Sequence, residues 1–253
     1  MRLEDVTPLI LALDEEANLG RTLEALRWAS QVVLLDSGSR DGTLAIAARH
    51  PNVKVCQRPF DDFAAQWNHG LSQVTTPFVL TLDADYVLDA GFADELRQLE
   101  PGAAAWSARF RYCIDGRPLR ATLLPPRVVL FRTAQARYVN DGHCQALRHD
   151  AAVAVLRSRI RHDDRKPLAR WLAAQQRYAV LEARKLRDTP WRRLGWPDRV
   201  RWLRLGPLLM PLYCLLAKGL LLDGRDGLFY TLQRTYAELL LVLHLADRGS
   251  RGP

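Results

Sequence analysis

The chain has 253 residues, enough for one large α/β domain or for a domain with a short appendage. Hydrophobic residues make up 48% of it and charged residues 25%, a globular composition that argues against bulk disorder. The formal net charge of +8 favours an anionic partner, namely nucleic acid, acidic lipid headgroups or a phosphorylated substrate.

The first half of the chain alternates strand signals with helix signals. Short apolar runs predict buried strands at residues 7–12, 32–35, 53–56 and 78–82. Apolar residues at helical spacing and an acidic helix start predict helices over residues 18–29, 41–49 and 60–74. Strands that alternate with helices predict a Rossmann-like α/β fold, with a mainly parallel sheet and helices on both faces.

The second half has a different pattern. An Asp115-Gly116 turn between residues 103–113 and 117–124 predicts a hairpin, and residues 127–132 and 137–140 predict further short strands. A long helix is expected from Pro167, followed by two apolar segments, 205–222 and 228–245, that form a helical hairpin around residues 223–227. We therefore predict one α/β domain over residues 1–165, made of two halves, 1–90 and 91–165, and a helical C-terminal region over residues 166–253.

Arginines and tryptophans are interspersed between residues 157 and 204, a mixture typical of a membrane interface. No nucleic-acid-binding motif accompanies them, so no nucleic-acid partner is expected. Within the segment 205–222 the longest uncharged run, 205–217, is shorter than the ~20 residues that a spanning helix needs. We expect this amphipathic region to lie on a membrane or to pack on the domain, and a re-entrant or spanning pair stays an alternative.

The four cysteines show no metal-ligand spacing, which favours buried, reduced thiols. The apolar run near the start of the chain is too short for the core of a signal peptide. The sequence therefore predicts a cytoplasmic protein that is peripheral on the inner face of the cell membrane.

Acidic residues follow three of the four predicted strands: Asp14 with Glu15, then Asp36, then Asp83 with Asp85. Ligands of such sheets bind beyond the carboxyl ends of the strands. Two carboxylates one residue apart suit Mg²⁺ or Mn²⁺, which in turn can clamp a diphosphate. Taken alone, Asp-x-Asp fits a solvated acidic turn equally well, so the neighbouring motifs decide between the two interpretations.

Four motifs, in this order and spacing, resemble the family 2 glycosyltransferases, which have the GT-A fold. They are LALDEEANL (residues 11–19), DSGSRDGT (36–43), QWNHGL (66–71) and LDAD (82–85). The chain looks most like the branch that includes lipopolysaccharide-core glucosyltransferases, which share a Gly-x-x-Asp-Gly segment similar to residues 222–227.

The resemblance implies inverting transfer of a sugar from a nucleotide-sugar donor, with a UDP type favoured, to a lipid-linked or cell-surface glycan acceptor. It makes residues 1–165 the catalytic domain, with a nucleotide-binding half (1–90) and an acceptor half (91–165). It implies a donor site that includes Leu13, Glu15, Asp36, Ser37, Asp41, Asn68, Asp83, Ala84 and Asp85. Within this site Asp36 would contact the base, and Asp83 and Asp85 would hold Mg²⁺ or Mn²⁺. His162, in a segment like the Ile-x-His of relatives, would be a further metal ligand.

The resemblance also implies a carboxylate base that deprotonates the acceptor hydroxyl. Relatives in this branch usually place a His-Glu pair after the middle strands, whereas this chain has His143 and Gln145 there. Gln145 cannot take a proton, so Asp141, the nearest carboxylate, is our first candidate for the base.

The second candidate for the base is Asp163, with Asp164 beside it, although Asp164 can instead cap the helix predicted from Pro167. The next two residues, Arg165 and Lys166, are candidates for binding a phosphate or an anionic headgroup.

Two other functions stay open at this point. A sugar nucleotidyltransferase has a related sheet, but it carries a Gly-rich basic loop after the first strand, where this chain has Asp14-Glu15-Glu16. A catalytically degenerate relative that binds nucleotide or scaffolds a glycan-assembly complex would explain the missing glutamate. Turnover of a nucleotide-sugar donor separates this last possibility from an enzyme.

Overall fold

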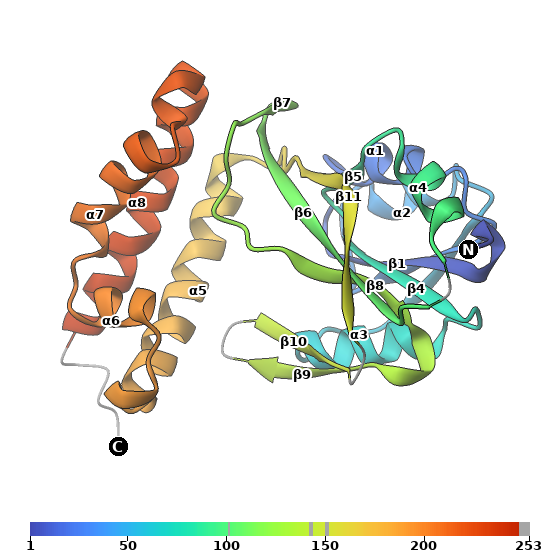
Figure 1. Ribbon diagram of the computed structural model, residues 1–253, viewed down its shortest axis with the longest axis horizontal. Coiled ribbons are helices and arrows are strands. Elements are labelled where there is room, and N and C mark those ends of the chain that lie inside the picture. Colours follow the sequence, from blue (N-terminus) through green and yellow to red (C-terminus); the bar gives the residue numbers. More distant parts are fainter. Residues whose placement is uncertain (101, 142–143, 150–151, 248–253) are drawn as a thin grey trace. The chain divides into compact units, whose positions relative to one another are not determined.

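The computed structural model describes residues 1–100, 102–141, 144–149 and 152–247 (Figure 1). The chain forms two compact units. The first holds Met1–Pro118 and Thr122–Lys166, and the second holds Leu119–Ala121 and Pro167–Pro253. The main boundary thus falls after Lys166, and the functional roles given to the predicted domains stay predictions.

The first unit is built on one sheet with the strand order β3-β2-β1-β4-β8-β6-β11-β5. In chain order its strands are β1 (Val6–Ala12), β2 (Val32–Asp36), β3 (Val53–Gln57), β4 (Phe78–Asp83), β5 (Tyr86–Leu88), β6 (Ala105–Ile114), β8 (Arg127–Arg132) and β11 (Val153–His162). β7 (Arg117–Pro118) pairs only with β6, and β9 (Arg137–Asp141) forms a separate hairpin with β10 (Cys144–Arg148).

Neighbouring strands from β3 to β4 are parallel, as are β6 and β11, whereas β8 and β5 run antiparallel to their neighbours. The predicted parallel first half and more antiparallel second half are confirmed. The buried strands β1, β2 and β4 are nearly continuous apolar runs because helices cover both of their faces.

Helices lie on both faces of this sheet (Figure 1). One face packs against α1 (Leu19–Glu24), α2 (Thr43–Ala47) and α4 (Phe92–Gln98), and the other against α3 (Phe63–Ser72). A 3₁₀ turn, Leu3–Asp5, precedes β1, and a second one, Thr133–Gln135, follows β8. The third helix begins later than residue 60, because extended Asp62 accepts a hydrogen bond from Ala65 N at 2.8 Å and caps it.

The sheet opens where the functional motifs end. β4 pairs with β8 only from Phe78 to Leu80, opposite Leu130–Arg132, and the two strands then separate. β1, β2 and β4 end at Ala12, Asp36 and Asp83, so the three motif loops leave the sheet along the same edge. The fold thereby places the predicted site residues beside an opening in the sheet.

The second unit is helical. Its helices are α5 (Leu168–Asp188), α6 (Trp196–Trp202), α7 (Gly206–Leu212) and α8 (Gly224–Ala246), with 3₁₀ turns at Trp191–Arg193 and Leu220–Asp223 and a π-helical segment at Tyr213–Ala217. The predicted helical hairpin exists, but its predicted turn at residues 223–227 is wrong. The chain turns at Gly219, with φ of 69°, and α8 already begins at Gly224. Gly227 then lies so close to Leu220 that a Cβ would stand 1.9 Å from the Leu220 carbonyl oxygen.

Glu238, which interrupts the last apolar segment in the sequence, is buried and pairs with Arg201 at 3.0 Å. By length and hydropathy, no described helix qualifies alone as a membrane span, although Gly206–Ala217 and Leu220–Ala246, which meet at 74°, qualify as a bent pair. Three cysteines are free thiols, Cys56, Cys113 and Cys214, of which the last two are buried.

Candidate functional site

Hydrogen bonds join the two loops that follow β1 and β2. Asp14 N donates to Ser39 Oγ at 2.8 Å, and Glu15 N donates to Thr43 Oγ1 at 2.7 Å. Polar residues of the first two motifs therefore have a local purpose, because their hydroxyls satisfy backbone donors of the opposite loop. The result is one continuous rim at the carboxyl ends of the two strands.

Asp36 lies at this rim, but its carboxylate is fully buried. It accepts hydrogen bonds from Gly38 N at 3.0 Å, from Ser39 N at 3.1 Å and from the Ser39 hydroxyl. These donors close the turn that follows β2, which is the kind of local bond that aspartate makes in turns. In this structure its oxygens hold the turn, and a contact of Asp36 with the nucleotide base stays a prediction.

Three other predicted donor-site residues have similar positioning roles. Asp41 accepts hydrogen bonds from Thr43 N at 2.9 Å and Glu16 N at 3.1 Å. Ser37 Oγ accepts a bond from Gln66 at 2.9 Å. Asn68 exchanges two 2.9 Å bonds with the backbone of Tyr138, which ties α3 to β9.

The remaining rim residues are Leu13 and Ala84. Leu13 is 45% exposed at the end of β1, which is unusual for a leucine beside a buried strand. Ala84 is buried, and its carbonyl oxygen accepts a 2.7 Å bond from Thr22. Of the rim residues considered so far, Leu13 thus presents the apolar surface that a ligand would contact.

Asp85 and His162 meet at the carboxyl ends of β4 and β11. His162 Nε2 lies 3.0 Å from Asp85 Oδ2, and the ring packs edge-on against Tyr86 and Tyr112. The other two polar atoms, Asp85 Oδ1 and His162 Nδ1, are buried without a hydrogen-bond partner. Buried polar atoms normally find partners, so this pair is suited to a further ligand.

The electrostatics of the pair favour its charged forms. Burial opposes ionisation of Asp85, but the charge and hydrogen bond of His162 outweigh burial and hold the pKa of Asp85 below its ordinary value. Burial alone would lower the pKa of His162. The charge and hydrogen bond of Asp85 raise this pKa by more than burial lowers it, so the net shift is upward. A carboxylate that stays ionised despite burial is a strong binder of cations.

Asp83 belongs to a different part of the site. It accepts a hydrogen bond from the Tyr86 hydroxyl and interacts with the charge of Arg127. Burial and the nearby charge of Asp85 raise the pKa of Asp83. The structure thus joins Asp85 to His162, as predicted, while Asp83 faces the pocket described next. Among the described residues no group of three His, Cys, Asp or Glu side chains is arranged to hold a metal by itself.

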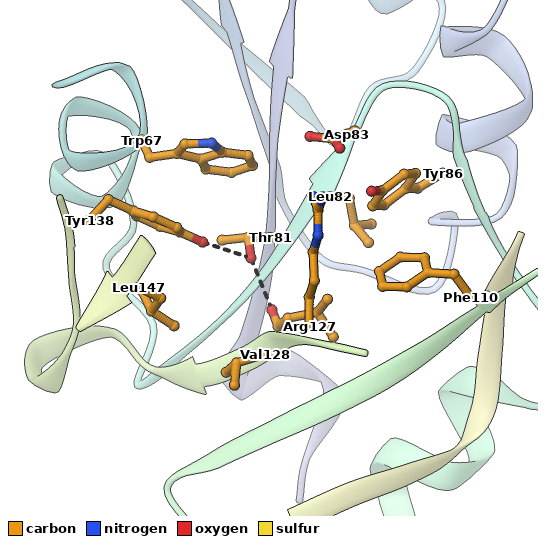
Figure 2. Close-up of a pocket in the computed structure, with 11 residues that line it drawn as sticks. Trp67, Thr81, Leu82, Asp83, Tyr86, Phe110, Arg127, Val128, Tyr138 and Leu147 are labelled. Carbon is orange, nitrogen blue, oxygen red and sulfur yellow. Dashed lines mark hydrogen bonds between the residues drawn. The ribbon is translucent and has the colours of Figure 1, made fainter. Parts of the chain in front are cut away.

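A pocket of about 300 Å³ lies where β4 and β8 separate. Its lining residues are Trp67, Thr81, Leu82, Asp83, Tyr86, Phe110, Arg127, Val128, Val129, Tyr138 and Leu147. Figure 2 shows Asp83, Tyr86 and Arg127 gathered at one end and Trp67 lying over Tyr138 at the other, with ring centroids 5.3 Å apart. Aromatic walls with a few charged groups are typical of small-molecule sites.

Asp163, the second candidate for the base, is 5% exposed and already engaged by three donors. It accepts hydrogen bonds from Gly116 N at 2.9 Å and Arg165 Nε at 3.1 Å, and Arg21 lies 3.5 Å away. Because its oxygens are committed to the Gly116 backbone and to guanidinium groups, the geometry gives Asp163 a structural role.

Asp164 does not cap α5, because Pro167 occupies the cap position and no side chain bonds to it. Asp164 instead accepts bonds from Asn18 Nδ2 at 2.9 Å and from Lys166 N at 3.0 Å. Lys166 Nζ donates to Glu15 at 2.6 Å. Burial raises the pKa of Glu15 to about 7 although the charge of Lys166 acts in the opposite direction.

The first candidate for the base cannot be placed in this way. The backbone of Asp141 belongs to β9, while its side chain, His143 and the Gln145 side chain lie outside the described residues. The role of Asp141 stays a prediction.

Several pocket residues were not predicted from the sequence. Tyr86 directly follows the Asp-x-Asp motif, and this position could have identified it as a site residue. Arg127 and Tyr138 carry no motif, because β8 and β9 reach the pocket only through the tertiary fold.

The comparisons with known proteins agree with this geometry. The family model "Glycosyl transferase family 2" matches residues 9–156. The lipopolysaccharide core biosynthesis glycosyltransferase LpsC of Rhizobium meliloti is 32% identical over 98 residues, which cover 37% of this chain and 36% of that protein. An uncharacterized glycosyltransferase of Mycobacterium tuberculosis, Rv0539, is 33% identical over 107 residues, 42% of this chain and 49% of that protein. The alignments thus span about a third to a half of these relatives.

Solved structures show the same fold at low sequence identity. The mannosyltransferase PcManGT from Pyrobaculum calidifontis, in complex with GDP-Man and Mn²⁺, has a TM-score of 0.54 at 16% identity and covers 96% of this chain and 88% of its own. S. aureus TarS 1-349, in complex with UDP-GlcNAc, has a TM-score of 0.50 at 14% identity and covers 95% and 89%. These likenesses confirm the predicted GT-A architecture, and they do not select one nucleotide, because the two proteins bind different ones.

The family model covers more than half of the chain, and its match contains the four motifs and Asp85, whereas His162 lies outside it. The chain therefore belongs to glycosyl transferase family 2.

Proposed function

We propose that this protein is a metal-dependent, inverting glycosyltransferase that uses a nucleotide-sugar donor of the UDP type and a lipid-linked or cell-surface glycan acceptor. The observation that carries the proposal is the Asp85–His162 pair, whose side chains lie 3.0 Å apart and each keep one buried polar atom without a hydrogen-bond partner. Family membership and a curated relative named for lipopolysaccharide core biosynthesis support the acceptor class.

The side chains of Asp85 and His162 are ligands that fit Mg²⁺ or Mn²⁺. In nucleotide enzymes such a cation takes one or two protein ligands, and substrate phosphates and water complete its coordination. Asp85 and His162 would hold it, with His162 as the neutral imidazole because metal binding displaces its proton, and Asp83 would interact with the charge of the cation. When bound, the cation neutralises negative charge that develops on the departing nucleoside diphosphate.

The chain's own residues have distinct tasks in this proposal. Leu13 offers its exposed side chain to the nucleoside, and Lys166, whose pKa is raised by Glu15 and Asp164 against the effect of burial, stays a cation at the rim. The pocket between Trp67 and Asp83 takes a sugar ring. Asp141 accepts the proton of the acceptor hydroxyl in this scheme.

A thermal-shift screen of the full chain tests the donor. UDP-glucose, UDP-GlcNAc and GDP-mannose are each added with and without Mn²⁺, because a ligand that binds the native state raises the apparent stability. At a concentration 100 times its Kd, the right donor adds about 2.7 kcal/mol of stability. A UDP-sugar should raise Tm only with Mn²⁺ present. Equal shifts without metal would contradict metal dependence, and a larger shift with GDP-mannose would contradict the UDP assignment.

We also propose that the protein associates with the inner face of the cytoplasmic membrane through its second unit. Residues 167–253 hold 15 Lys and Arg against 7 Asp and Glu, a net +8, whereas residues 1–166 hold 21 of each. The whole excess of positive charge therefore lies in the helical region. Large apolar side chains are also exposed there, including Leu208 at 71%, Leu212 at 57% and Leu216 at 67%. Cations beside exposed leucines suit an anionic bilayer surface.

Replacing Leu208, Leu212 and Leu216 together with serine should weaken partitioning into vesicles with 30% phosphatidylglycerol by about 100-fold. Each leucine that inserts contributes about 1 kcal/mol or more. Co-sedimentation at low salt measures the effect. Serine at the exposed Val55 and Val155 of the first unit is the control and should change nothing. If wild-type protein stays in the supernatant, the membrane proposal fails.

A further inference from the structure

Four arginines share one face of two neighbouring strands. β6 and β11 run parallel, and their register pairs Arg109 with Arg159 and Arg111 with Arg161. Paired residues on adjacent strands project to the same face, and residues two apart on a strand do likewise. The alternate residues Phe110 and Ile160 are buried in the core on the other face. The arginines therefore form one basic patch on the face away from that core.

Three members of this basic patch have no neutralising partner. Arg161 Nε lies 3.3 Å from Asp89. Arg109 and Arg111 are exposed, Arg159 is half-buried, and none of the three forms an ion pair with any residue that the structure describes. Asp163, the next nearest carboxylate along β11, is taken by Arg21 and Arg165.

Stability alone does not explain this arrangement. Like charges directly opposite each other on neighbouring strands are destabilising, and here two such pairs occur in succession. Neighbouring strands lie only about 4.8 Å apart, so the two arginine side chains of each pair extend from neighbouring backbone positions. A bound anion between them would turn this repulsion into attraction.

The basic patch is continuous with the pocket between β4 and β8. Ser107, two residues before Arg109 on the same face, pairs with Val128, which lines the pocket. At its other end the patch reaches Arg161, the residue before His162. β6 and β11 are parallel neighbours up to the pair Tyr112 and His162 at this end of the sheet. An extended ligand on the patch therefore leads toward the proposed sugar pocket.

We propose that Arg109, Arg111 and Arg159 bind phosphate or carboxylate groups of an anionic saccharide acceptor. This inference rests on the proposed glycosyltransferase function. The planar guanidinium binds both kinds of group through paired hydrogen bonds, and Arg is preferred over Lys for this geometry. Three unneutralised arginines on two strands match an acceptor that carries at least two anionic groups.

Glucose 1,6-bisphosphate, with glucose as the uncharged comparison, serves as the probe in calorimetric titrations of the full chain at 50 mM salt. We expect the wild-type protein to bind the bisphosphate but not glucose. Replacing Arg109, Arg111 and Arg159 together with glutamine should weaken the affinity for the bisphosphate about tenfold or more. The control variant has glutamine at Arg27, Arg49 and Arg97, which are exposed and lie outside β6 and β11. Its net charge equals that of the patch variant. It should bind within about twofold of wild type. Equal losses in both triple variants, no loss in either, or equal binding of glucose would overturn the proposal.

Stability measurements and lipid vesicles complete the test. The Tm of the triple variant in the basic patch should not fall, because repulsion between arginines is removed. If this triple variant does not fold, Arg111→Gln is compared with Arg49→Gln. Vesicles of phosphatidylglycerol test a lipid source: loss of vesicle binding with unchanged bisphosphate binding would assign the patch to the membrane and overturn the proposal. Donor shifts with Mn²⁺ are measured on the same variants. Arginine-dependent bisphosphate binding without any donor shift would refute the proposed function and leave the anion site standing.

Discussion

Asp85→Asn is expected to reduce Mn²⁺-stimulated release of UDP from a UDP-sugar by about a thousandfold. Asparagine keeps the shape of the side chain but removes the charge that the cation needs. Metal stabilisation of a transition state is worth several kcal/mol, and about 4 kcal/mol corresponds to that factor. Initial rates with saturating donor, measured across a Mn²⁺ titration, give both the loss in rate and the shift in metal affinity.

The fold of the Asp85 variant should be intact. Loss of its charge removes repulsion of Asp83 and also removes attraction to His162, so the two effects oppose each other, and asparagine keeps an oxygen that can face the His162 ring. Asp94→Asn is the matched control, since Asp94 is 70% exposed and pairs only with Arg97 on α4. A variant at Asp85 that keeps more than a tenth of the wild-type rate would refute its role as metal ligand.

Asp163→Asn is expected to destabilise the protein by about 2–4 kcal/mol and to leave the rate of the folded enzyme within about tenfold of wild type. Breaking a buried ion pair from one side typically costs 3–5 kcal/mol, and the partial exposure of Arg21 and Arg165 lowers this figure. Urea denaturation gives the stability, and UDP release well below Tm gives the rate.

The two measurements separate a structural role of Asp163 from a catalytic one. If Asp163 were the catalytic base, Asp163→Asn would lower the rate of UDP release by about a thousandfold or more and leave the stability unchanged. Asp115→Asn, on the same hairpin turn beside Gly116, is the control; it is exposed at φ of 48°, a conformation that asparagine tolerates. It should change stability by less than about 0.5 kcal/mol. A stable but inactive Asp163 variant would restore Asp163 as the base.

The strands at the centre of the parallel half were predictable because β1, β2 and β4 are buried on both faces and form nearly continuous apolar runs. Residues 127–132 match β8, and residues 78–82 match β4 to within one residue at its end. The second unit was less predictable. Its turn depends on the positive φ of Gly219 and on the close contact between Gly227 and Leu220, neither of which hydropathy can show.

The site was predictable as a neighbourhood but not in the use of each carboxylate. A strand-end aspartate can bind a ligand or its own turn, and both uses leave the same sequence. Asp36 and Asp41 turned out to satisfy backbone donors, whereas Asp85 kept an unpartnered oxygen. The arginine patch depends on the register of two strands about 50 residues apart, so only the folded chain reveals it.

Anomalous scattering from Mn²⁺, in crystals of the protein grown with UDP and MnCl₂, tests the central claim most directly. The account predicts one strong peak between the Asp85 carboxylate and the His162 ring, with the diphosphate on its open side. A metal peak elsewhere in the chain, or UDP bound at this rim without a metal at Asp85, would contradict it.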